Sequence, residues 1–128
     1  MLKHLNPEGV PKPGSPYSQA VEAAPGMRWL HISGQIGVAP DGTVLEGAAA
    51  QIEQIWRNIL GCLEAAGMGP KDLVKVTVLL TRTEDIPVSR EIRQRMLQGA
   101  EPASTLMVVA GLASPKFLAE IEAIAAAP

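Results

Sequence analysis

A change of hydrophobic period between residues 48 and 81 constrains the fold more than any other feature of this sequence. From Ala48 to Ala66, apolar side chains recur at steps of three and four residues, which predicts an amphipathic helix. Gly67 stands where a left-handed residue would end that helix, and Pro70 bars its continuation. The next run, Leu73–Thr81, is nearly all apolar and rich in β-branched residues, as expected for a strand covered on both faces. A helix followed so closely by a buried strand indicates a domain of mixed α and β structure.

The same patterns predict the remaining elements. A loop at Pro11–Pro16 leads into the first strands, and a strand follows at Trp29–Ile36. A second helix is expected at about Ile86–Leu97, and the last two strands at Thr105–Ala110 and Leu118–Ala125. In this order, two helices cover one face of a mixed sheet. The other face also needs cover, and a partner subunit is the expected source.

Length and composition narrow the possibilities further. No linker divides the 128 residues, so we expect a single domain spanning residues 1–128. With one cysteine, Cys62, no internal disulfide can form, and no secretory signal is evident, which together favour a cytoplasmic location. No apolar run is long enough to span a bilayer. A net charge of -2 and an aromatic content of 3% disfavour nucleic-acid binding, because they neither attract phosphates nor stack bases.

The sequence indicates neither a metal nor a phosphate-binding loop. His4, His31 and Cys62 lack the spacing of metal ligands, so no metal site is expected. The glycines around Pro70 belong to a helix-to-strand turn. Since His31 lies on a strand without an acidic or nucleophilic partner nearby in sequence, a structural role is favoured for it.

Glu120 is the strongest candidate for chemistry. It lies two residues from Glu122 on a strand, so both carboxylates point to the same face. The strand is otherwise apolar, which suits a carboxylate that handles water, although a solvated strand face would explain both residues. Tyr17 lies in a loop, where its phenol either fills a surface gap or donates a hydrogen bond to a ligand. Gly34 allows the close approach of a ligand or a neighbouring chain.

Three separated segments resemble the Rid family, also called YjgF or L-PSP endoribonuclease-like. They are Ser15–Ala20, Ile32–Ile36 and Glu120–Ala125, and they occur in the family's order along almost the whole chain. Gln51 and Asn58 in the first helix also match the family pattern. One such motif would be weak, whereas the ordered set is specific.

The resemblance implies a chorismate-mutase-like (YjgF) fold, of α/β (α+β) class, that assembles as a homotrimer with a ligand cleft at each subunit interface. The best-known members hydrolyse reactive enamines and imines to a keto acid and ammonia, without a cofactor. In that scheme Glu120 positions or activates water, while Tyr17 and Ser33 line the pocket.

The sequence departs from the family at an arginine that holds the substrate carboxylate. Residues 102–105 read Pro-Ala-Ser-Thr, so Ser104 occupies the arginine's place, and Ser104 and Thr105 become the expected ligand-binding residues. A hydroxyl supplies neither the charge nor the planar fork of a guanidinium. The departure argues against the standard 2-imino acid deaminase activity and predicts a less acidic substrate. Alternatively, Arg82 or Arg93 replaces the clamp, although the basic stretch around Arg93 otherwise predicts a solvated helix face.

Three functions therefore remain open. The leading hypothesis is a cofactor-independent hydrolase of a small enamine or imine metabolite, with Glu120 as its catalytic residue. The second is a non-catalytic trimer that binds a small metabolite or a partner protein. The third, an endoribonuclease, comes from the family's label and has little support from the residues.

Overall fold

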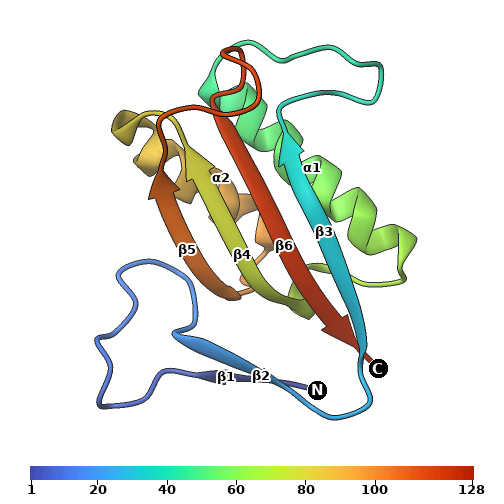
Figure 1. The fold of residues 1–128 in the computed structure, drawn as a ribbon. Coiled ribbons are helices and arrows are strands. Elements are labelled where there is room, and N and C mark those ends of the chain that lie inside the picture. The colour runs from blue at the N-terminus through green and yellow to red at the C-terminus, as the bar shows by residue number, and fades with distance from the viewer.

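The computed structural model describes all 128 residues of the chain. Six strands, two α-helices and two short 3₁₀ helices follow one another along it (Figure 1). In chain order they are β1 (Leu2–Leu5), β2 (Ala20–Ala23), β3 (Arg28–Ile36), α1 (Ala48–Ala65), η1 (Pro70–Asp72), β4 (Leu73–Leu80), η2 (Thr83–Asp85), α2 (Ile86–Leu97), β5 (Ala103–Val108) and β6 (Ala119–Ala127).

The main sheet has four strands in the order β3-β6-β4-β5. The C-terminal strand β6 lies between β3 and β4 and is antiparallel to both, whereas β4 and β5 are parallel. Strands β1 and β2 form a separate antiparallel pair below the sheet in Figure 1, and a bridge from Ser18 to Ala103 joins this pair to the edge of β5. The N-terminal segment thus lies next to the start of β5.

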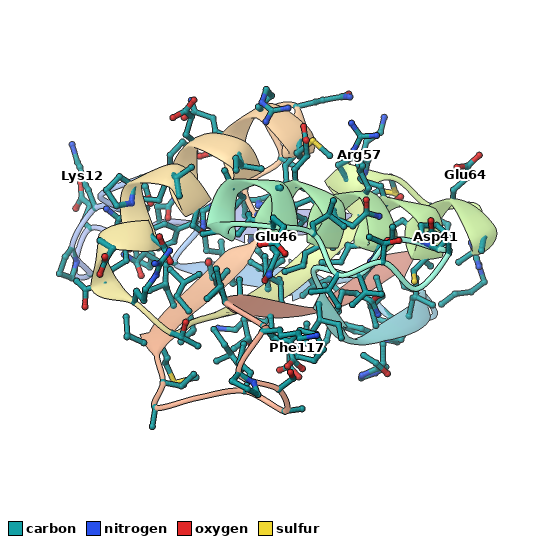
Figure 2. All side chains as sticks on the ribbon, turned by 90° about the horizontal axis from the view of Figure 1, so that it is seen from above. Lys12, Asp41, Glu46, Arg57, Glu64 and Phe117 are labelled. Carbon is teal, nitrogen blue, oxygen red and sulfur yellow. The ribbon has the colours of Figure 1, made fainter.

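One face of the sheet packs against both helices and forms the core. In β4, the residues Val76, Val78 and Leu80 point to this side and are almost fully buried. Trp56 and its apolar neighbours on α1 meet them from the helix layer. Figure 2 shows the helices as one layer above the sheet, with labelled charged side chains such as Arg57 projecting outward from α1. The amphipathic pattern therefore placed the apolar stripe toward the sheet, as predicted.

The opposite face of the sheet, which we call the open face, has no helix on it. Lys75, Thr77 and Leu79 of β4 point to this side and are each partly exposed. Trp29 at the edge of β3 keeps 53% of its surface exposed. Within one chain the helices cover only one face of residues 73–80, and the cover of the other face by a partner subunit stays a prediction.

Most predicted elements are confirmed, although the strands differ from their predicted bounds by up to two residues and one strand, β1, was not predicted. The bounds of α2 agree with the prediction, and Gly67 has the expected left-handed conformation, with φ 69°. Strand β5 begins at Ala103, two residues earlier than predicted, because Ala103 and Ser104 already pair with β4. Strand β1 was not predicted, since its polar residues carry no strand signal of their own. Neither helix has the length and apolar character needed to cross a membrane.

Candidate functional site

Glu120 lies near the start of β6, on the open face. It pairs with Leu79 of β4 and Ile36 of β3, and the β3 ladder shifts register just before Ile36, between Ile32 and Gln35. Gly34 lies in this bulge, and a side chain there would overlap the Glu120 carboxylate, whose Oε2 is the nearest atom. The close approach predicted at Gly34 is therefore to Glu120 of the same chain. The bulge and the absence of a side chain at Gly34 together leave the space that the Glu120 carboxylate occupies.

Ser33, next to Gly34 in the bulge, is exposed on the same side of the sheet. A shallow hollow of about 340 Å³ runs along the seam between β3 and β6 beside it. The residues that line it are His31, Ile32, Ser33, Glu122, Ala123 and Ile124. Glu122 pairs with Thr77 and so shares the open face with Glu120, as their spacing predicted. The structure thus brings Ser33 and the two carboxylates to one side of the sheet.

The Gln51 side chain of α1 forms hydrogen bonds to the backbone of the segment that precedes β6. Its side chain is 2% exposed and donates hydrogen bonds to the carbonyl oxygens of Leu45 and Lys116, at 3.0 and 2.8 Å. Its own Oε1 accepts a hydrogen bond from the backbone N–H of Leu118, two residues before Glu120, at 2.8 Å. Since all of its polar groups are used inside the protein, Gln51 holds the strand start that carries Glu120.

A second polar cluster lies on the helix side of the sheet, around Arg93 of α2. The Arg93 side chain reaches β5, where its Nη1 donates to the hydroxyl of Ser104 at 3.1 Å. Its Nη2 donates to the hydroxyl of Ser15 in the N-terminal segment at 3.3 Å. Only 7% of Arg93 is exposed, so the predicted solvated face is wrong at this residue. The N-terminal segment and β5 cover the guanidinium.

Electrostatics sets Arg93 apart from the other arginines. Burial lowers its pKa, the positive charge of Arg90 lowers it further, and Tyr17 acts in the opposite direction. No acidic side chain forms an ion pair with it. Arg82, the other arginine considered as a clamp, is held by both oxygens of Asp85 at 2.9 and 3.1 Å, a contact that raises its pKa. Arg82 is thus neutralised within the protein, whereas Arg93 is not.

Four of the five predicted site residues therefore fall into two groups, and Thr105 lies apart from both. Tyr17 and Ser104 lie with Arg93, and Ser33 lies with Glu120. Thr105 faces the open side, since it pairs with Thr77, and its hydroxyl accepts a hydrogen bond from Lys75 Nζ at 2.7 Å. Sequence reasoning named Arg93 only as one of two substitutes for the missing arginine; the signal that could have singled it out, its burial, depends on long-range packing.

Within one chain the two groups are too far apart to hold one small ligand. Ser104 pairs with Val76 of β4, while Glu120 pairs with Leu79, three residues further along the same strand. That offset is about 10 Å along the strands, and two strand spacings add about 10 Å across the sheet. The groups also lie on opposite faces. A site that uses both must combine two copies of the chain.

The histidines and the cysteine lie apart from both groups, except for His31 at the hollow. His4 Nδ1 lies 2.8 Å from the Ser18 hydroxyl and 3.2 Å from the carbonyl oxygen of Glu101, so it joins the N-terminal pair of strands to β5. No group of three or more His, Cys, Asp or Glu side chains lies together in a way that could hold a metal ion.

Fold and geometry together define a small α+β protein with an acidic candidate half-site around Glu120 on its open face and a buried cationic candidate half-site around Arg93 at its margin. Comparison with known proteins agrees with this fold. The family model described as Endoribonuclease L-PSP matches residues 8–127. A RutC family protein of Pyrococcus horikoshii is 40% identical over 121 residues, covering 92% of each chain. The 2-iminobutanoate/2-iminopropanoate deaminase of Mus musculus is 36% identical over 125 residues, covering 96% of this chain and 90% of that protein.

Solved structures support the same grouping. A Yersinia pestis protein of unknown function, described as YyfB of the conserved Rid protein family, superposes with a TM-score of 0.88 at 31% identity, with 97% of each chain covered. The chain belongs to the Rid family, also called YjgF. The predicted family and the predicted YjgF fold are thereby confirmed.

Proposed function

We propose that the protein is a cofactor-independent hydrolase that deaminates a small imine or enamine. The observation that carries this proposal is the Glu120 carboxylate, which lies against Gly34 in the β3 bulge, on a strand whose residues other than Glu120 and Glu122 are all apolar. A carboxylate that lies beside an uncovered surface is suited to take a proton from water. The deaminases of mammals among the relatives support the reaction class.

The reaction needs only water and proton transfers. Glu120 accepts a proton from water as the water oxygen attacks the carbon of the C=N bond, and it returns this proton to the nitrogen, which gives a neutral carbinolamine. Glu120 then takes the hydroxyl proton of the carbinolamine and passes it to the nitrogen, so that the C–N bond breaks and ammonia leaves as the C=O bond forms. An enamine enters the same path after protonation at carbon, which converts it to the imine. Ser33, next to Gly34 in the bulge, and Tyr17, in the cationic half-site, orient the ligand.

The site is proposed to form between subunits of a homotrimer. Glu120 and Arg93 lie on opposite faces of one sheet, so one small ligand meets both only where two copies of the chain touch. The open face also carries partly exposed apolar side chains, such as Leu79 and Ile124, which a second copy would cover. The expected solution mass is three times the 13.5 kDa mass of the chain.

The decisive experiment measures imine decay. Imines generated in solution by an amino-acid oxidase are trapped with semicarbazide, and hydrolysis by the protein lowers the amount of semicarbazone formed. We expect Glu120→Gln to slow hydrolysis by about two to four orders of magnitude, the contribution of a positioned general base. Glu122→Gln is the matched control, because it removes a carboxylate from the same face and strand, and it should retain most of the activity.

The panel includes anionic and neutral imines. Absence of hydrolysis across the whole panel, in a preparation with the trimer mass, would contradict the proposal. Saturable binding of a ligand without product would then favour the non-catalytic alternative. If the wild type and Glu120→Gln hydrolyse the imines equally, the proposed role of the carboxylate is wrong.

A further inference from the structure

We infer that the chain has a second ligand site, distinct from both half-sites, and that this site binds a small zwitterion, a free α-amino acid. The site is a hollow of about 270 Å³ between strand β1, the 3₁₀ helix η1 and the connection from α2 to β5, which we call the margin hollow. None of the residues that line it belongs to either half-site, so the inference does not depend on the proposed hydrolase.

One side of the margin hollow is held by hydrogen bonds among its own residues. The hydroxyl of Ser18, which is only 2% exposed, donates to the carbonyl oxygen of Glu101. His4 Nδ1 lies 2.8 Å from the same hydroxyl and 3.2 Å from the same carbonyl oxygen. Because a carbonyl oxygen only accepts, Nδ1 carries the hydrogen, and the neutral ring keeps a lone pair on Nε2. Nε2 makes no hydrogen bond within the chain, so it can accept one from a ligand.

Two opposite charges border the margin hollow and are both unpaired. Lys71 of η1 and Glu101 of the α2–β5 connection line it, and neither takes part in any ion pair of the chain. The two side chains are thus too far apart to neutralise each other, although they border the same small volume. A ligand with separate positive and negative groups pairs with both of them, whereas a simple anion or cation leaves one unpaired.

The hydrogen-bonding groups around the margin hollow match the two ends of an amino acid. Its ammonium group only donates, and the Glu101 carboxylate and His4 Nε2 are the acceptors for it. Its carboxylate only accepts, and Lys71 Nζ and Asn6 Nδ2 are the donors. Asn6 Nδ2 is unused because only Oδ1 of this amide is engaged, by the backbone N–H of Gln19 at 2.8 Å.

The size and the position of the margin hollow restrict the ligand to a small amino acid. A second hollow of about 350 Å³ adjoins it and shares Lys71, Gly99 and Ala100 with it, which leaves room for a short side chain. A ligand held by His4 on β1 and by Lys71 on η1 also links two parts of the chain. Without a ligand, the N-terminal pair of strands is joined to β5 by the bridge from Ser18 to Ala103 and by the contacts of His4.

The test is isothermal titration calorimetry on the intact protein. The probes are L-alanine, N-acetyl-L-alanine, which lacks the ammonium group, L-alaninamide, which lacks the carboxylate, and inorganic phosphate. We expect L-alanine to bind and each derivative to bind roughly tenfold to a hundredfold more weakly, the loss expected for one charge-assisted contact. Lys71→Gln and Glu101→Gln should each weaken the binding of L-alanine by a similar factor. Lys3→Gln, which changes an exposed lysine of β1 outside the margin hollow, is the control and should bind like the wild type.

Hydrogen exchange locates the bound amino acid. L-alanine should slow the exchange of the amide hydrogens of β1 in the wild type, because the ligand joins β1 to η1, and it should not do so in Lys71→Gln. Lys71 and Glu101 are both exposed, so their substitution should leave the melting temperature without ligand nearly unchanged. Equal slowing of β1 in the wild type and in Lys71→Gln would place the ligand elsewhere and overturn the inference.

The outcomes also separate this site from the proposed active site. Glu120→Gln should bind L-alanine like the wild type, and a variant that loses this binding while Lys71→Gln keeps it would place the amino acid on the open face. Failure of the wild type to bind L-alanine, or phosphate binding as tight and as dependent on Lys71, would contradict a zwitterion site. A protein that binds L-alanine through Lys71 and hydrolyses no imine would contradict the hydrolase and support the margin hollow as an amino-acid site.

Discussion

The two faces of the central sheet differ in what they do, although they are built from alternate residues of the same strands. On the covered face, Val76, Val78 and Leu80 are buried against the helices and supply the apolar area that stabilises the fold. On the open face, Lys75, Thr77 and Leu79 are only partly buried. The covered face satisfies its packing within one chain, whereas no element of the chain covers the open face. The packing that stabilises the fold and the proposed chemistry are thus separated by the two-residue period of a strand.

The same division is visible in two glycines at the end of β3. A side chain at Gly37 would overlap the Cβ, Cγ and Cα atoms of Gln51 on the covered side. A side chain at Gly34 would overlap the carboxylate of Glu120, at the free end of a longer side chain on the open side. The Gln51 atoms belong to a packed helix, whereas the Glu120 carboxylate can move away from an added side chain. We therefore expect a side chain at Gly37 to disturb the fold and a side chain at Gly34 to disturb the proposed site.

The largest effect is expected from a charge placed on each face of β4. Val78→Asp buries a carboxylate without a partner in the core and should cost at least about 4 kcal/mol, enough to unfold much of the protein. Thr77→Asp, one residue away, places its charge on the open face opposite Glu122. That change should leave the protomer folded and weaken self-association. Thermal melts followed by circular dichroism, with light scattering for the mass, measure both effects.

Two outcomes would break the comparison. If Thr77→Asp unfolds the chain as completely as Val78→Asp, the open face contributes to the fold as much as the covered one. If Thr77→Asp keeps the wild-type mass and stability, the open face is not the surface that associates.

Intermediate effects, on stability and on activity, are expected from substitutions of Gly37 and Gly34. Gly37→Ala should cost about 1–3 kcal/mol of stability, because the added methyl group meets packed atoms of Gln51. Gly34→Ala should change the melting temperature little but lower the rate of imine hydrolysis by about a hundredfold, since the Glu120 carboxylate is displaced. Gly61→Ala in α1, where a methyl group meets nothing within 4 Å, is the control and should not reduce activity.

A Gly34→Ala variant that keeps full activity would show that the position of Glu120 does not limit the rate. A Gly34→Ala variant that melts as early as Gly37→Ala would show that the bulge is part of the core. Either result would contradict the assignment of Gly37 to the fold and of Gly34 to the proposed site.

The covered face could be predicted from the sequence, and the cationic half-site could not. The apolar stripe of α1 and the alternation in β4 are local patterns, and each follows from the period of its own element. The burial of Arg93 depends instead on Ser15 and Ser104, which approach it from 78 and 11 residues away. A polar helix stretch gives no sign of such cover, so a solvated face was the natural expectation.

The open face was predicted in part. The shared direction of Glu120 and Glu122 follows from strand geometry, and the need for cover on a second face follows from the number of helices. The contact between Gly34 and Glu120 depends on the pairing of β3 with β6, which are separated by more than 80 residues. Sequence reasoning found the glycine and the carboxylate separately but had no means of joining them.

The smallest effect on stability is expected at a third surface, the outer side of the helix layer. This surface neither packs against the sheet nor belongs to the proposed site. There Arg95 of α2 donates a hydrogen bond to Glu53 of α1 at 2.9 Å, and this contact, with Arg57 nearby, lowers the pKa of Glu53. A lowered pKa in the folded state means that the contact stabilises the protein above the ordinary glutamate pKa and is lost as the pH falls through the folded value. Glu53→Gln should therefore lower the melting temperature slightly at about pH 7 and not at about pH 3, with a smaller difference in high salt. Calorimetry at the two pH values measures it, and a difference that stays constant with pH would mean that Glu53 acts through packing rather than charge.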